Sequence, residues 1–180
     1  MKINTKRLII RPLSEEDRES MTGLLTNAVI KKTYMLPDFG SEEEAVQLFE
    51  RLRALSLSEE HYVGGICLSD QLIGFLNDVE QTKDSIELGY VISPEFHNCG
   101  FATEALGGVI SDLFARGFFE VTAGAFEENR ASIRVMEKCG MNRVEREEEI
   151  AYRGEVHHCV YYSIKKDKYE EKSNRSGGAL

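Results

Sequence analysis

Apolar residues recur along this chain with two spacings, one typical of strands and one typical of helices. Strands are predicted at residues 7–11, 61–68, 72–79, 86–92, 120–126, 144–152 and 155–164. Helices are predicted at residues 14–29, 41–55, 105–114 and 131–139. One strand, two helices, a meander of three strands, and then helix, strand, helix and two strands predict a mixed α/β sheet of the α+β kind.

The stretch Ile86–Leu106 predicts a strand, a tight loop and the start of a helix. Pro94 has no N–H to donate, so the strand should end before it. Gly100 and Ala102 stand where the helix begins. The first N–H groups of a helix have no partner within it, and its dipole adds about half a positive charge there. The loop therefore predicts a site for a phosphate group.

Two common phosphate loops are excluded by the residues present. The loop has no Gly-Lys-Ser/Thr, and glycines 100, 107 and 108 lack the spacing of a dinucleotide fold. The segment instead resembles the Arg/Gln-x-x-Gly-x-Gly/Ala loop of the GNAT superfamily of acetyl-CoA-dependent N-acetyltransferases. Gly100 and Ala102 are in register with that pattern, and His97 stands where the family usually has Arg or Gln.

Two further segments carry the same resemblance. Thr5–Asp17 has the form T-x-R-L-x-I-R-P-L-x-x-x-D, which resembles the branch that includes the ribosomal-protein N-terminal alanine and serine acetyltransferases. Residues 129–141 are similar to the family's N-x-x-S/A-x-x-h-h-E-K-x-G-F segment, with Met141 in place of Phe. From its periodicity alone, this last segment is predicted to be a helix that packs on the rest of the fold and ends at Gly140.

The resemblance implies the GNAT fold, a mostly antiparallel sheet with helices on both faces, with acetyl-CoA as co-substrate and no metal. It puts the pantetheine amides on the strand, the pyrophosphate on the loop and Asn129 on the pantetheine arm. The cofactor-binding residues predicted in this way are Tyr90, Val91, Ile92, His97, Asn98, Cys99, Gly100, Phe101, Ala102, Thr103, Asn129 and Ser132. Arg130, Arg134 or Lys138 either approaches the adenosine phosphates or lies on a solvated helix face.

In this family the amine attacks the thioester directly, so no covalent enzyme intermediate is expected. A lysine-like amine is neutral in about one molecule in 2,500 at pH 7, whereas roughly a tenth of an α-amine is neutral. Glu87 is the candidate catalytic base, and the alternative is an ordinary strand carboxylate. The family's general-acid Tyr is replaced by Met136, so the acid stays unassigned. Tyr90, Tyr152, Tyr161 and release without a protein acid are the alternatives.

The acceptor site is expected in residues 31–40, between the first two helices. The resemblance favours Tyr34, Asp38 and Phe39 as substrate-binding residues; the alternative is that these side chains only pack beneath a connection. The acceptor is a protein N-terminal α-amine or a small amine such as a polyamine, an amino acid or an antibiotic. A non-catalytic acyl-CoA-binding or regulatory module is the competing class, and a longer acyl chain is a further alternative.

Composition restricts these alternatives further. With 180 residues, 42% of them hydrophobic, the chain predicts a single domain over residues 1–166 and a disordered tail over 167–180. The net charge of −9 argues against a nucleic-acid partner and is compatible with a cationic amine. Four cysteines without a C-x-x-C pair favour a reducing compartment, and no apolar run is long enough to span a membrane. A cytoplasmic protein is therefore expected, and homodimer formation stays open.

Overall fold

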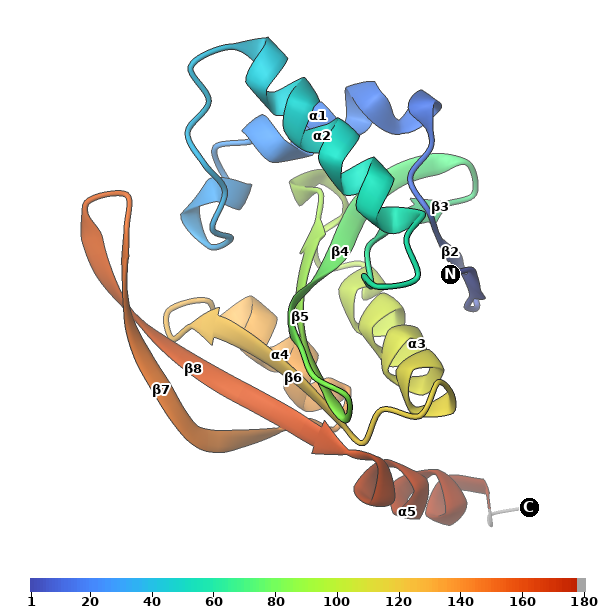
Figure 1. Ribbon diagram of the computed structural model, residues 1–180. Coiled ribbons are helices and arrows are strands. Elements are labelled where there is room, and N and C mark those ends of the chain that lie inside the picture. Colours follow the sequence, from blue (N-terminus) through green and yellow to red (C-terminus); the bar gives the residue numbers. More distant parts are fainter. Residues whose placement is uncertain (178–180) are drawn as a thin grey trace. The chain divides into compact units, whose positions relative to one another are not determined.

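The computed structural model describes residues 1–177, and its strands and helices follow the predicted order (Figure 1). The strands are β1 (Ile3–Asn4), β2 (Leu8–Arg11), β3 (Gly64–Leu68), β4 (Gln71–Gln81), β5 (Ser85–Ile92), β6 (Glu120–Phe126), β7 (Asn142–Tyr152) and β8 (Glu155–Lys165). The helices are η1 (Glu15–Asp17), α1 (Arg18–Thr26), η2 (Ile30–Lys32), α2 (Glu42–Ser56), η3 (Pro94–Phe96), α3 (Phe101–Ala115), α4 (Arg130–Lys138) and α5 (Lys166–Gly177).

The strands pair in the order β1-β2-β3-β4-β5-β6-β8-β7. β5 and β6 are parallel, whereas β1–β2, β2–β3, β3–β4, β6–β8 and β7–β8 are antiparallel. The predicted class, a mixed and mostly antiparallel sheet with helices, is therefore confirmed. No helix within residues 1–177 is long and apolar enough to cross a membrane.

The chain divides into two compact units. The first contains Met1–Asp78 and Gly89–Gly108, and the second contains Val79–Leu88 and the chain from Val109 on. The backbone passes between the units within β4, β5 and α3. The single domain over residues 1–166 stays a prediction.

The core of the first unit forms where α1 and α2 pack on β3, β4 and the end of β5. Its buried members are Leu13, Met21, Leu24, Leu25, Ile30, Leu36, Phe49, Cys67, Leu72, Phe75 and Val91. Burying a side chain of this size stabilises a fold by about 1.5–3 kcal/mol relative to exposing it. This cluster therefore fixes β5, the strand that leads to the predicted phosphate loop.

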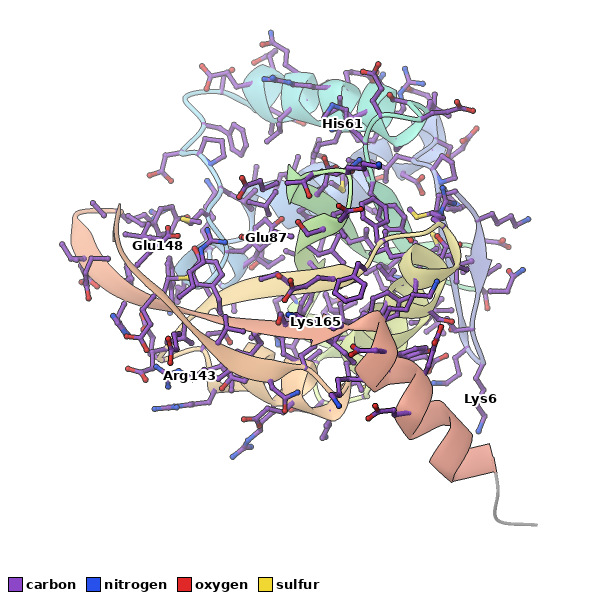
Figure 2. All side chains as sticks on the ribbon, turned by 60° about the horizontal axis from the view of Figure 1, so that its bottom comes forward. Lys6, His61, Glu87, Arg143, Glu148 and Lys165 are labelled. Carbon is purple, nitrogen blue, oxygen red and sulfur yellow. The ribbon has the colours of Figure 1, made fainter. Side chains whose placement is uncertain are left out.

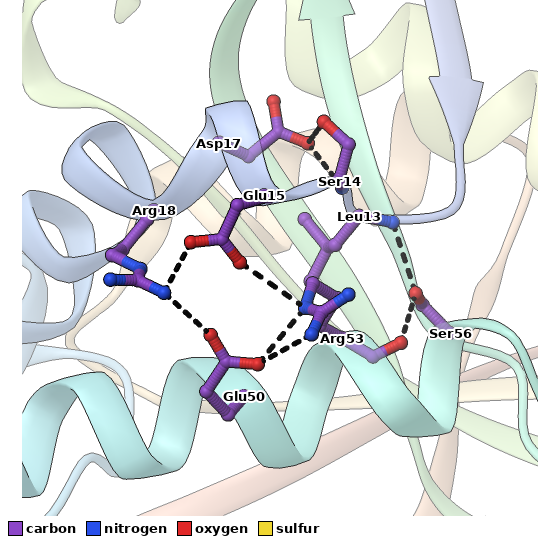
Figure 3. A network of polar contacts seen from close by, with 8 residues as sticks. All are labelled: Leu13, Ser14, Glu15, Asp17, Arg18, Glu50, Arg53 and Ser56. Atoms are coloured by element: carbon purple, nitrogen blue, oxygen red, sulfur yellow. Dashed lines mark hydrogen bonds and ion pairs between the residues drawn. The ribbon is translucent and has the colours of Figure 1, made fainter.

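Polar contacts join the start of α1 to α2 in the same unit (Figure 3). Glu50 Oε1 lies 3.3 Å from Arg18 Nη2, and Glu50 Oε2 lies 2.7 Å from Arg53 Nη2. The backbone N–H of Leu13 donates to Ser56 Oγ over 3.0 Å, and Ser56 Oγ donates to the Arg53 carbonyl over 2.7 Å. Ser56 thereby provides a hydrogen-bond partner for the buried N–H group of Leu13, in the segment that follows β2.

The first helix is shorter than predicted. Ser14 and Asp17 form a capping box at the start of the predicted helix, but they cap the 3-10 turn η1, and α1 follows from Arg18 to Thr26. The Asn27 side-chain carbonyl accepts from the N–H groups of Val29 and Ile30 at 2.9 and 3.2 Å. This local turn competes with the helix, so the prediction that the helix extends to residue 29 was wrong, and Val29 is exposed.

The second unit is built on β6, β8 and β7. β6 pairs with β8 from Glu120↔Lys165 to Phe126↔Cys159, and β7 and β8 are joined at Arg153 and Gly154, whose φ angles are +53° and +82°. Two positive φ angles in a two-residue loop fit the right-handed twist of a hairpin.

α5 occupies most of the segment for which composition predicts a disordered tail. Lys166 Nζ donates to the Phe114 carbonyl over 2.9 Å, and the Tyr169 ring lies 5.2 Å from the Phe114 ring. These contacts with α3 favour a helix that the polar composition alone does not predict. Residues 178–180 lie outside the described chain.

Candidate active site

The loop after β5 has the backbone shape of an anion cradle. Asn98 and Gly100 have φ angles of +60° and +79°, in the left-handed region that these two residue types adopt more readily than others. The first hydrogen bond of α3 runs from the Glu104 N–H to the Gly100 carbonyl, over 3.0 Å. The N–H groups of residues 101–103 precede this bond and follow directly after Gly100. This arrangement fits a phosphate group.

His97 ties the loop to the end of β5. Its Nε2 atom lies 2.9 Å from the Ile92 carbonyl oxygen, so a hydrogen on Nε2 is donated to that oxygen. Val91 and Ile92 have buried side chains, and Val91 belongs to the core. What these two residues can offer a ligand is therefore their backbone. The structure brings together the predicted segments 90–92 and 97–103 within the first unit.

Arg7, which was not among the predicted site residues, lies against this loop. Its Nη1 donates to the Cys99 carbonyl over 3.0 Å, and its Nε is 2.7 Å from Glu104 Oε2. The guanidinium carbon lies 4.4 Å from the centre of the Phe101 ring. Hydrogen bonds from Arg7 and Thr5 outweigh the desolvation of Glu104 and lower the pKa of its carboxyl group. The T-x-R-L motif includes Arg7 but does not indicate which residues Arg7 contacts.

The predicted acceptor residues lie in two different surroundings. Lys31, whose side chain is nearly buried, has its Nζ 3.4 Å from Asp38 Oδ1 and 4.8 Å from the centre of the Phe39 ring. Asp38 and Phe39 thus contact a cation of their own segment. The Tyr34 ring instead packs edge-on against Phe75 in the core, at 5.7 Å.

Glu87 lies in the second unit, in an ion pair with Arg146 of β7. Arg146 Nη1 is 2.7 Å from Glu87 Oε2, and Arg146 Nη2 is 2.8 Å from Glu148 Oε1. Figure 2 labels both carboxylates, Glu87 and Glu148. The Glu87 side chain is only 11% exposed. Burial raises the pKa of Glu87, although the hydrogen bond and the charge of Arg146 oppose the rise. A carboxylate in these surroundings is shielded from water and can accept a proton.

The tyrosines considered as proton donors differ in their surroundings. The Tyr161 ring lies beneath Arg146, with the guanidinium carbon 3.8 Å from its centre, and burial raises the pKa of its hydroxyl group. The Tyr152 ring lies 6.1 Å from the Phe126 ring and packs against the cluster of Phe126, Cys159 and Tyr161. Tyr90 is half-buried on β5, in the first unit. The second unit therefore places Tyr161 at the Glu87–Arg146 pair.

Asn129 and Ser132 begin α4 in the second unit. Asn129 Oδ1 accepts from the Ser132 N–H over 3.2 Å, which caps the helix. The three basic residues of this helix, Arg130, Arg134 and Lys138, are exposed, and Gly140 ends the segment at a φ of +85° as predicted. Within residues 1–177, no group of three or more His, Cys, Asp or Glu side chains could hold a metal ion.

A known family matches most of this chain. The family profile described as "Acetyltransferase (GNAT) domain" matches residues 7–142. Among curated proteins, the uncharacterised N-acetyltransferase YoaA of Bacillus subtilis is 31% identical over 146 residues, which cover 78% of this chain and 82% of that protein.

Solved structures share the fold at lower identity. A ribosomal L7/L12 α-N-protein acetyltransferase in complex with coenzyme A aligns with a TM-score of 0.80 at 18% identity, over 93% of this chain and 99% of that one. A spermidine N-acetyltransferase from Vibrio cholerae, in complex with coenzyme A and spermine, aligns with a TM-score of 0.78 at 20% identity, over 91% and 98%. The two have different acceptors, so the shared fold leaves the acceptor of this chain undecided.

Proposed function

Because this chain belongs to the GNAT family of acetyl-CoA-dependent N-acetyltransferases, we propose that it acetylates a primary α-amine, with a protein N-terminus as the acceptor. The reaction is direct attack of the neutral amine on the thioester carbonyl carbon. The C–N bond forms, the C–S bond breaks, and the electron pair leaves with the coenzyme A thiolate. No side chain of the protein is acylated.

The first unit supplies the groups for the donor substrate. The loop of residues 97–103 would hold the pyrophosphate through the N–H groups at the start of α3, and β5 would bind the pantetheine amides through the backbone of Tyr90–Ile92. Arg7 adds a cation beside the same loop. Asn129 and Ser132 stay predictions from the resemblance alone.

Glu87 would take the proton that the amine loses. It is shielded from water and Arg146 holds its side chain in one orientation, so a proton passes to it directly or through one water molecule. The acid that protonates the thiolate stays unassigned, because Met136 is fully buried where the family has Tyr. Solvent is a sufficient proton source for a thiolate leaving group, because a thiolate is a weakly basic anion; the cysteine thiol, for comparison, has a pKa of about 8.5.

The ion pair of Glu87 with Arg146 carries the preference for an α-amine. Arg146 limits the rise in the pKa of Glu87 that burial causes, so Glu87 is a weaker base than the same buried carboxylate would be without Arg146. This strength suits an amine that is already neutral in roughly a tenth of its molecules at pH 7. A polyamine needs a stronger base and would bring further cations close to Arg146. The net charge of −9 favours cationic acceptors in general. The positive charge of Arg146 has the opposite effect beside Glu87, where it disfavours an acceptor with several cationic groups.

Thiol release from acetyl-CoA tests the proposal. The acceptors are peptides beginning with Ala or Ser, the same peptides with a blocked N-terminus and a free lysine, spermidine, free amino acids and an aminoglycoside. We expect release with the free N-termini and little with the blocked peptides. Faster release with spermidine or with the aminoglycoside would overturn the assigned acceptor. Calorimetric binding of acetyl-CoA without release for any amine would favour the competing class, an acyl-CoA-binding module, to which the loss of the family's tyrosine also points.

A further inference from the structure

Tyr34 occupies the space that a side chain at Gly89 would need. A Cβ atom built on Gly89 would lie 2.6 Å from the Tyr34 hydroxyl oxygen and 3.2 Å from two carbons of the Tyr34 ring. Real Cβ atoms are essentially never found at the shorter distance. Gly89 is therefore required for space, and the ring and hydroxyl group of Tyr34 cover this position of β5.

Three further contacts hold Tyr34 in place. Its hydroxyl group donates to Asn77 Oδ1, and Asn77 Nδ2 in turn donates to the Asp78 carbonyl over 2.9 Å. Its ring packs edge-on against the buried Phe75, and its backbone N–H donates to the Ile30 carbonyl over 2.9 Å. Burial raises the pKa of the Tyr34 hydroxyl group, so the phenol stays neutral and remains a donor to Asn77 at physiological pH. The Tyr34 side chain is therefore held in one position and forms a wall over Gly89, although Tyr34 lies in a connecting segment between two helices.

The position of Gly89 on β5 gives this wall a function. The phosphate loop follows the C-terminal end of β5, and the proposed function puts the pantetheine arm on Tyr90–Ile92. An arm that runs back along the strand from the loop reaches Gly89 next, about 3.3 Å beyond Tyr90. The acyl end of the donor then lies beside Gly89, where Tyr34 covers the strand.

We propose that Tyr34, seated on Gly89 and held by Asn77, closes the acyl end of the donor site and limits the donor to short acyl chains. This inference rests on the proposed function, because it takes the course of the pantetheine arm from it. A chain longer than acetyl meets the ring of Tyr34. The ring does the excluding, and the hydroxyl group fixes its position.

Binding and turnover of an acyl-CoA series test this role. Affinities for acetyl-, propionyl- and butyryl-CoA are measured by calorimetry, and kcat/KM is measured with one acceptor, for the wild type and for Tyr34→Ala, Tyr34→Leu and Tyr34→Phe. In the wild type, affinity should fall from acetyl- to butyryl-CoA. In Tyr34→Ala, the ratio of butyryl-CoA to acetyl-CoA affinity should rise about tenfold, since two more methylene groups become buried. Tyr34→Phe keeps the ring and should keep the wild-type ratio.

Controls separate the possible failures. Met35→Ala changes the next side chain, which is 52% exposed, and should leave the ratio unchanged. If Tyr34→Ala does not fold, Tyr34→Leu still shortens the wall while keeping an apolar contact with Phe75, and its ratio decides the question. Equal binding of butyryl- and acetyl-CoA by the wild type, or an unchanged ratio in the folded variants, would overturn the inference while the proposed function stands. Binding of no acyl-CoA by the wild type would overturn the proposed function itself.

Discussion

Arg146 of β7 points its guanidinium group at Glu87 of β5, with Nη1 and Oε2 2.7 Å apart. An irregularity in β7 accompanies this contact. Between the pairs Arg143↔Tyr162 and Glu147↔Val160, β7 advances by four residues while β8 advances by two. Bulges of this kind change the direction in which a side chain points and are frequent beside active sites. The bulge therefore aims Arg146 at the candidate base.

Replacing Arg146 should move the pH dependence of the reaction. Only the ionised form of Glu87 can accept a proton, and burial already raises its pKa. Arg146→Gln removes the charge that opposes this rise, so Glu87 would keep its proton to a higher pH. The acidic limb of the kcat/KM profile should then shift to higher pH. Arg143→Gln, which removes an exposed arginine of the same strand, is the control, and an unmoved limb in Arg146→Gln would exclude Glu87 as the titrating base.

Removing the base itself should affect acceptors unequally. Glu87→Gln should lower kcat by about 10²–10⁴-fold for an acceptor with the pKa of a lysine, within the usual range for general-base catalysis. The loss should be smaller for a peptide α-amine, because far more of it is already neutral. Initial rates with the two acceptors at pH 7 measure this difference. Glu148→Gln, which alters the other carboxylate at Arg146, should leave the ratio of the two rates near the wild-type value.

Arg7 should matter for donor binding more than for chemistry. Arg7→Met removes the cation that lies beside the phosphate loop and leaves the negative charge of Glu104 without its guanidinium partner, and that charge then repels an anion. Affinity for coenzyme A, measured by calorimetry, should fall about tenfold with little change in kcat, near the lower end of the range for a hydrogen bond to a charged group. Lys6→Met is the matched control on the exposed neighbouring residue. Equal losses in both variants would indicate general electrostatic attraction instead of a contact.

The sequence predicted the central segment well, because its features are local. Alternation along β5, Pro94 after it and Gly100 before α3 each act within a few residues, and the observed strand, loop and helix lie where expected. Local competition also explains the main error, since the Asn27 side chain ends α1 early through bonds only two and three residues away.

The contacts that the sequence could not predict join residues far apart in the chain. Arg146 lies 59 residues from Glu87, and Arg7 lies 97 residues from Glu104. The spacing of apolar residues gives no information on contacts between residues so far apart. The direction of the Arg146 side chain also depends on the bulge in β7, whose residues have the composition of an ordinary polar strand. Tyr34 was predicted as an acceptor residue, but its position on Gly89 needs the folded chain.

Asp17 should stabilise the fold in a pH-dependent way. Its carboxylate is 4% exposed and bonds Arg11 through both oxygens, at 2.7 and 2.9 Å. Burial alone would raise its pKa, but the bonds from Arg11 and from the Ser14 N–H lower it. Asp17→Asn should cost about 2–3 kcal/mol, less than a fully buried pair because Arg11 is partly exposed.

The sign of the pH effect at Asp17 follows from linkage. A carboxyl group whose folded pKa is lowered gives its full stabilisation above its unfolded pKa and loses it as the pH falls through the folded value. The difference in unfolding free energy between wild type and Asp17→Asn should therefore shrink on acidification, as measured by urea denaturation at several pH values. Glu19→Gln, at an exposed position of α1, should leave the urea midpoint unchanged. A difference that stayed constant down to the lowest pH would contradict the lowered pKa.

Gly89 and Tyr34 should be energetically coupled in a way that a four-protein cycle can measure. Gly89→Ala alone places a methyl group 2.6 Å from the Tyr34 hydroxyl oxygen and should cost about 1–3 kcal/mol, as overpacking usually does. In a Tyr34→Phe background the nearest ring atoms are 3.2 Å away and have to yield by only a few tenths of an ångström, so the same substitution should cost about 1 kcal/mol less. Urea unfolding of the wild type, both single variants and the double variant gives this coupling. Gly107→Ala, where nothing beyond the adjoining backbone of its own helix lies within 4 Å of the added methyl group, should have the same effect in both backgrounds. If Gly89→Ala cost the same with Tyr34 and with Phe, the hydroxyl group would not be seated on Gly89, and the wall proposed at the acyl end would lose its structural basis.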